Sequence, residues 1–105
     1  MLAGADGVVS VASNVVPSAF RRLCDLARAG DAAATHEFDA RLQALYHFLG
    51  IEPNPIPVKA LLALDGLGHG LRLPLLPFSS THAEQAQRLH AAMSQLEHRC
   101  RALAA

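Results

Sequence analysis

The sequence predicts part of an α/β protein, with one buried strand followed by four helices. Residues 7–12 form a short, β-branched and almost wholly apolar run, which is typical of a strand buried on both faces of a parallel sheet. Four later segments carry apolar residues at helical spacing. Before the third of these, residues 52–59 (Glu-Pro-Asn-Pro-Ile-Pro-Val-Lys) hold three prolines at alternate positions, which exclude a helix or a central strand and predict a rigid connector.

The first two helices follow the predicted strand directly. The first is expected to begin at Pro17 or Ser18 and to end at Gly30, so that strand and helix form half of a βαβ unit. Its apolar residues are Val16, Phe20, Leu23 and Ala27. The second is expected over residues 31–49, with Asp31 as its N-terminal cap. Its apolar stripe consists of Phe38, Leu42, Leu45 and Leu49.

The other two helices are separated by chain rich in glycine and proline. The third starts just after the proline connector and stops at the glycines of residues 66–70, and residues 71–78 are expected to be an extended, packed connector. Its core candidates are Leu61, Leu62 and Leu64. Thr81 and Glu84 form a capping box at the start of the last helix. That helix has an apolar seam, expected to pack on the other helices or on a neighbouring subunit, made of Ala86, Leu89, Met93, Leu96, Cys100 and Leu103.

A lone buried strand poses a physical problem. Its N–H and C=O groups would stay unpaired on both edges, which is costly unless neighbouring strands arrive. Nothing else in the sequence is a credible parallel partner. Either another chain supplies the sheet, or these residues are the C-terminal piece of a longer α/β protein; we favour the second explanation.

Composition excludes several classes of function. The formal net charge of the 105 residues is zero, which argues against a nucleic-acid-binding or anionic-membrane-binding surface. No stretch approaches the roughly 18 apolar residues of a membrane span, and the first residues lack the pattern of a signal peptide, so the cytoplasm is the expected location. Cys24 and Cys100 lie far apart and are expected to be reduced thiols.

The sequence contains no complete active site of its own. Lys59, the only lysine, could act as a Schiff-base amine, but no tyrosine, carboxylate or second lysine is spaced to assist it, so a structural role is favoured. His82, His90 and His98 recur every eight residues and do not stack on one helical face, so they are expected on the surface. No metal-ligand spacing appears, and neither a metal nor a cofactor is expected.

The proline connector carries a family resemblance. Residues 52–59, followed at a distance by residues 71–74 (Leu-Arg-Leu-Pro), closely resemble the 4-hydroxy-tetrahydrodipicolinate synthase (dihydrodipicolinate synthase) family. Residues 4–11 (Gly-Ala-Asp-Gly-Val-Val-Ser-Val), with Asn14 and Val15, look like the last barrel strand of the same family. The resemblance covers essentially the whole chain in order. The strand motif alone is shared with other pyruvate-dependent aldolases such as N-acetylneuraminate lyase.

The resemblance implies the end of a (β/α)8 TIM barrel, an α/β fold. Residues 1–30 would be its last β-strand and α-helix, and residues 31–105 the C-terminal helical domain. The family is a lyase, commonly a homotetramer, that condenses pyruvate with aspartate semialdehyde in lysine biosynthesis, through a Schiff base on a barrel lysine and a tyrosine relay. These groups lie upstream of Met1, so no catalytic residue is assigned here and the chain alone is expected to be inactive. Only Val9 maps to a ligand-contacting position, against bound pyruvate.

Two hypotheses of different classes follow. In the first, the chain is a fragment of a Schiff-base lyase that functions only with the upstream barrel segment. In the second, it is a free-standing helical interaction module that uses the apolar seam of the last helix to form homo-oligomers.

Overall fold

The computed structural model describes residues 1–104, and within them every regular element is a helix. The α-helices are α1 (Pro17–Arg28), α2 (Ala32–Ala40), α3 (Gln43–Leu49), α4 (Ile56–Leu64) and α5 (Ala83–Ala104). Two short 3-10 helices, η1 (Ala12–Asn14) and η2 (Ser80–His82), precede α1 and α5. No helix in this part of the chain is long and apolar enough to cross a bilayer.

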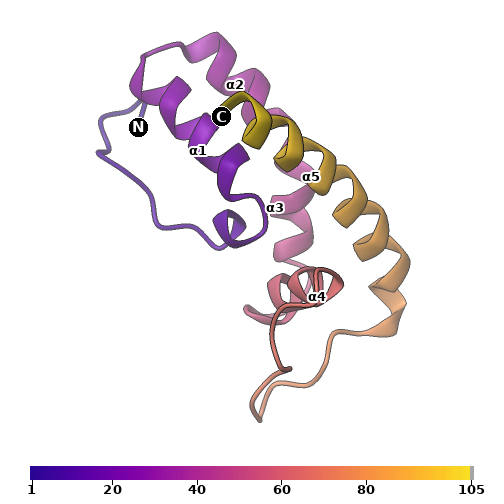
Figure 1. Ribbon diagram of the computed structural model, residues 1–105. Coiled ribbons are helices and arrows are strands. Elements are labelled where there is room, and N and C mark those ends of the chain that lie inside the picture. The colour runs from indigo at the N-terminus through magenta and orange to yellow at the C-terminus, as the bar shows by residue number, and fades with distance from the viewer. Residues whose placement is uncertain (105) are drawn as a thin grey trace.

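The longest helix, α5, organises the fold. It runs along the length of the molecule and contacts α1, α3 and α4 in turn (Figure 1). Its apolar seam is buried in these contacts from Ala86 to Cys100, as predicted, while Leu103 at its end is 81% exposed. The core residues that face the seam come from η1, α1, α3, α4 and the turns beside them, chiefly Val16, Ala19, Leu42, Leu45, Phe48 and Leu61.

The predicted strand at residues 7–12 does not form within this chain. Residues 5–10 have no regular structure, and Ala12 belongs to η1. The physical reason is the one that makes a lone strand costly: among residues 1–104 there is no second strand to pair with its backbone. The β-branched side chains of this segment consequently stay exposed, with Val8 at 57% and Val9 at 104%.

The predicted helix over residues 31–49 is two helices. Asp31 caps α2 as expected, since its Oδ1 accepts the Ala34 N–H at 3.0 Å. At the break, the N–H groups of Arg41 and Leu42 bond to carbonyls three residues back rather than four. The break changes which residues face the core, so that Phe48, absent from the predicted stripe, is fully buried, whereas Leu49 lies at the edge.

The proline connector is shorter than predicted, because α4 begins at Ile56, inside residues 52–59. Pro57 lies in the first turn of α4, where the N–H that proline lacks would have no partner within the helix. Ile56, Pro57 and Val58 are buried at the start of α4 together with Leu61, whereas the predicted core residue Leu64 is 43% exposed. The Asn54–Pro55 and Leu73–Pro74 peptide bonds are cis. Leu62 is only partly buried.

The start of α5 differs from the predicted capping box. Thr81 lies inside η2, and Ser79 caps that turn, because the Ser79 hydroxyl oxygen accepts the Thr81 N–H at 3.3 Å. The Ser79 N–H donates in turn to Glu52 Oε2 at 3.2 Å, which joins the proline connector to the start of the last helix. Glu84 lies in the first turn of α5, where its charge suits the helix dipole.

Candidate functional site

The candidate pyruvate contact lies on an irregular segment beside α1. Residues 7–11 loop away from α1 and return to it at η1 (Figure 1). The Val9 side chain is fully exposed, and Val11 is 38% exposed. Val9 does not line the neighbouring groove, although Gly7 and Val8 do. The role of Val9 therefore stays a prediction.

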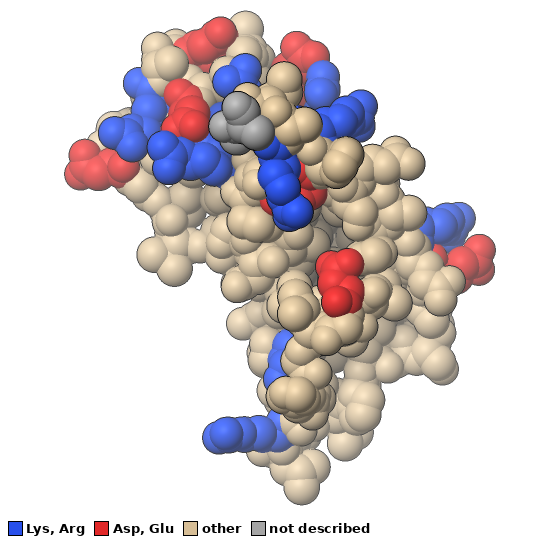
Figure 2. Space-filling view, viewed as in Figure 1, with Lys and Arg blue, Asp and Glu red and all other residues tan. Residues whose placement is uncertain are grey.

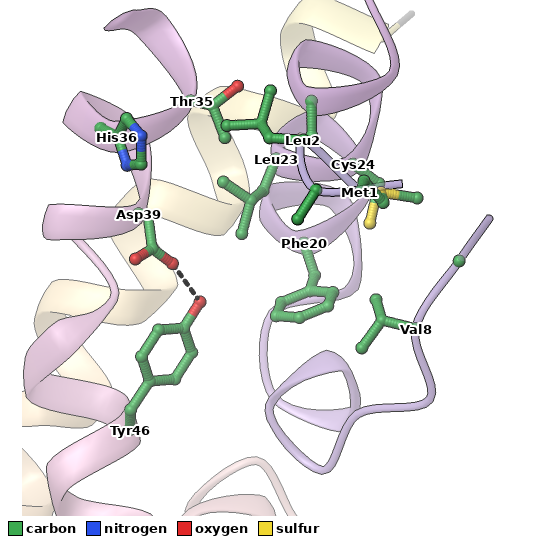
Figure 3. A pocket seen from close by; sticks show the side chains of 13 residues that line it. Met1, Leu2, Val8, Phe20, Leu23, Cys24, Thr35, His36, Asp39 and Tyr46 are labelled. Atoms are coloured by element: carbon green, nitrogen blue, oxygen red, sulfur yellow. Dashed lines mark hydrogen bonds between the residues drawn. The ribbon is translucent and has the colours of Figure 1, made fainter. Parts of the chain in front are cut away.

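A groove with a volume of about 410 Å³ opens between the N-terminal segment and α1, α2 and α3. Its α1 wall is apolar and carries Phe20, Leu23 and Cys24, while Asp39 and Tyr46 come from the facing helices (Figure 3). The groove is lined by Met1, Leu2, Ala3, Gly7, Val8, Phe20, Leu23, Cys24, Ala27, Thr35, His36, Asp39 and Tyr46. Apolar side chains dominate this list, so the groove is suited to packing rather than to binding a small charged ligand.

On the polar wall of the groove, Asp39 and Tyr46 are hydrogen-bonded to each other. Tyr46 donates its hydroxyl to Asp39 Oδ1 at 3.0 Å, and Gln43 Nε2 donates to the other carboxylate oxygen at 2.9 Å. Burial raises the pKa of Tyr46 above its ordinary value, and both the hydrogen bond to Asp39 and the negative charge of that carboxylate raise it further. The phenol therefore remains protonated at neutral pH and does not serve as a base. The sequence alone predicts no role for Tyr46, although its i, i+7 spacing from Asp39 is an available signal.

Lys59 lies outside this groove. Its Nζ donates a hydrogen bond to the carbonyl of Gly70, on the glycine-rich loop that follows α4. A second hollow, of about 170 Å³, lies between α4 and this loop and includes Lys59 and Phe78 in its lining. The contact ties the loop to α4 and supports the structural interpretation of this lysine.

His82 in η2 and His90 and His98 in α5 do not converge on one another. His90 Nε2 lies 2.7 Å from Asp65 Oδ1, so it links the end of α4 to α5, and the ring of His82 packs 5.7 Å from that of Phe78. His98 is exposed, as predicted. Among residues 1–104, no three His, Cys, Asp or Glu side chains lie in a group that could hold a metal ion.

Comparison with known proteins relates this arrangement to one family. Residues 1–96 match the family model described as the dihydrodipicolinate synthetase family. The chain is 63% identical over 97 residues to the 4-hydroxy-tetrahydrodipicolinate synthase of Xanthomonas campestris pv. campestris, and 57% identical over 97 residues to that of Xylella fastidiosa. In both comparisons 92% of this chain is covered, but only 32% of the relative.

Two solved structures resemble the fold. The crystal structure of the chloride-inhibited dihydrodipicolinate synthase from Acinetobacter baumannii, complexed with pyruvate, matches 89% of this chain with a TM-score of 0.83 and 34% identity. A monomeric dihydrodipicolinate synthase variant matches 90% of it with a TM-score of 0.79 and 42% identity. This chain spans 32% and 31% of those two chains. The predicted fold class is confirmed, since the helices α1–α5 correspond to a helical part of these TIM-barrel proteins, and the chain belongs to the dihydrodipicolinate synthetase family.

Proposed function

We propose that this chain is the C-terminal portion of a pyruvate-dependent Schiff-base lyase, and that it acts only when a preceding barrel segment is joined to it or bound by it. Residues 1–30 would then be the last barrel strand and helix, and residues 31–105 the C-terminal helical domain. The observation that carries the proposal is the exposed row of Val8, Val9 and Val11 in a chain that spans 32% of its curated relatives. Apolar β-branched residues are normally found inside sheets, not in water.

The charge distribution supports the same proposal. On the face drawn in Figure 2, charged side chains gather over α1, α2 and the end of α5, whereas the region around α4 and its following loop carries only a few. That loop also exposes large apolar side chains, with Leu67 at 57%, Leu73 at 85% and Leu76 at 67%. Several large apolar side chains exposed in one region are typical of an area that another part of a protein covers.

In the proposed reaction, the amine of a barrel lysine adds to the keto carbon of pyruvate and water leaves, which forms an imine. Loss of a methyl proton gives the enamine, because the protonated imine nitrogen accepts the electron pair. The enamine carbon then attacks the aldehyde carbon of aspartate semialdehyde, and the aldehyde oxygen takes up a proton to become a hydroxyl. The amino group of that substrate then attacks the restored imine carbon, and the lysine amine leaves. In this chain, Val9 would supply an apolar contact to pyruvate at the barrel mouth, where barrel enzymes keep their active sites. The product would enter lysine biosynthesis in the cytoplasm, and a homotetramer would be the assembled form.

The alternative of a free-standing oligomerisation module is less well supported. It needs the apolar seam of α5 as an interface, but Ala86, Leu89, Met93 and Leu96 are already buried within the chain, each at most 8% exposed. A seam that is covered by α1, α3 and α4 has no surface left for a second copy.

The test mixes this chain with the part of the Xanthomonas campestris relative that precedes the matched region, then adds pyruvate and borohydride, which traps an imine as a stable amine. We expect no adduct on this chain alone, and an adduct on a lysine of the added barrel segment in the mixture. Replacing Lys59 by Arg is the matched control and should leave trapping unchanged. An adduct on Lys59 in the isolated chain would refute the proposal, as would a soluble mixture without any adduct.

A further inference from the structure

Glu97 is the one buried charged side chain in the part of the chain that the structure describes, at 6% exposure. It lies in α5, one residue beyond the stretch that matches the family model. A buried carboxylate is costly unless hydrogen bonds satisfy it. The hydrogen bonds that Glu97 makes therefore indicate its role.

Both oxygens of Glu97 bind the N-terminus of α1. Oε1 accepts the Ser18 N–H at 2.8 Å, and Oε2 accepts the Ala19 N–H at 2.9 Å. The local sequence offers no side-chain cap, because the capping position is Val16, whose side chain has no acceptor atom. The Glu97 carboxylate, distant in sequence, supplies the acceptors that the start of α1 lacks. Its negative charge also suits the positive end of the helix dipole.

The turn held in this way is continuous with the segment that contains Val9. The Val16 N–H donates to the Ala12 carbonyl at 3.1 Å, and both of these residues are buried. Within η1, Ser13 Oγ donates to the Ser10 carbonyl at 2.7 Å. A chain of short contacts therefore leads from the N-terminus of α1 through η1 to the residue that follows Val9.

We propose that Glu97 is a positioning residue: by binding the N-terminus of α1 it fixes the point at which the Val9 segment ends. The inference rests on the proposed function, in which Val9 contacts pyruvate. Glu97 touches no reacting atom in this scheme. Its effect on the reaction passes entirely through the placement of α1 and η1.

A cavity beside Glu97 allows the idea to be tested by chemical rescue. It has a volume of about 420 Å³ and is lined by Asn14, Pro17, Glu97 and Arg101, among others. Arg101 Nη2 lies 3.7 Å from Glu97 Oε1, so a cation flanks the carboxylate position. In the Glu97→Ala variant, acetate can therefore enter from the cavity and take the place of the missing carboxylate, whereas a neutral molecule of the same size, acetamide, lacks the charge that this position favours.

The first measurement is amide hydrogen exchange of the isolated chain by NMR. In Glu97→Ala, exchange at Ser18 and Ala19 should rise roughly 10- to 100-fold, the range expected when a hydrogen bond to a charged group is lost. Acetate should restore protection in a saturable way and acetamide should not. Glu84→Ala, an exposed glutamate on the same helix, should leave both amides unchanged. Unchanged exchange in Glu97→Ala, or equal rescue by the two additives, would overturn the inference.

The second measurement uses the mixture with the barrel segment and the variants Glu97→Gln and Glu97→Asp. For Glu97→Gln we expect a several-fold higher KM for pyruvate with kcat little changed, and partial recovery in Glu97→Asp, since Val9 affects ground-state binding of pyruvate. An unchanged KM beside altered exchange would overturn the positioning role and leave only a stabilising one. A wild-type mixture without adduct would instead overturn the proposed function and with it the link to Val9, a result visible before any Glu97 variant is made.

Discussion

Replacing Val9 by Asp separates the stability of this chain from its assembly with a barrel. In the isolated chain the Val9 side chain is fully exposed. A carboxylate at that position stays in water, so the free energy of unfolding should change by no more than about 0.5 kcal/mol, as for other surface substitutions. Chemical denaturation of the two proteins, followed by circular dichroism, measures this difference.

Assembly should respond very differently. Burying a valine side chain stabilises by about 1.5–3 kcal/mol, and an unpaired buried carboxylate carries a further effective penalty of several kcal/mol. The total is about 4 kcal/mol or more, which weakens binding of the barrel segment roughly a thousandfold. Titration calorimetry and borohydride trapping both measure this loss. Leu103→Asp is the matched control, because Leu103 is 81% exposed and lies beyond the family match. If Val9→Asp bound the barrel segment as tightly as the wild type, the buried-strand reasoning would be wrong.

Three further predictions concern the chain alone. Tyr46 is the only tyrosine, and its pKa is raised by burial and by Asp39. Absorbance near 295 nm should therefore show tyrosinate at a higher pH in the folded chain than in urea, where the pKa is about 10. The free energy of unfolding should fall as the pH rises above that value, and Tyr46→Phe should remove this fall. Cys24 should react with iodoacetamide well before Cys100, whose pKa is raised by burial and then by the Glu97 charge, and peptide mass spectrometry would reveal the opposite order. Leu61→Ala should cost about 2–5 kcal/mol in denaturant unfolding, whereas Leu64→Ala on the same helix, where the side chain is 43% exposed, should cost far less.

Much of the helical arrangement could be predicted because its signals are local. Proline and glycine mark helix ends through the backbone angles they allow, and the apolar seam from Ala86 to Cys100 follows from spacing alone. The break at Arg41 and Leu42 carries no such mark, since neither residue disfavours a helix. Its consequence, the burial of Phe48 against Phe78, depends on a contact across 30 positions in sequence with ring centroids 5.3 Å apart.

The limits of prediction at the candidate site have a different cause. A strand exists only with its neighbours, so the pattern of residues 7–12 indicates a preference that this chain alone does not satisfy. The Glu97 contacts join residues 78 and 79 positions apart, and neither the lack of a cap at Val16 nor one glutamate on a helix reveals a partner at that separation. The family, by contrast, could be recognised from the connector, because three spaced prolines leave little freedom for other sequences to produce the same pattern.

The position of α5 at the end of the sequence has a consequence for synthesis on the ribosome. Translation delivers residues from the N-terminus at roughly 5–20 per second, so α1 to α4 emerge before the helix that covers them. Until then the core around Leu45, Phe48 and Leu61 is uncovered on one side, because the buried seam residues that complete it belong to Ala83–Ala104. A premature stop early in α5 would thus remove the centre of the fold rather than its edge. Nascent chains of this protein should be good substrates for chaperones that bind exposed apolar segments.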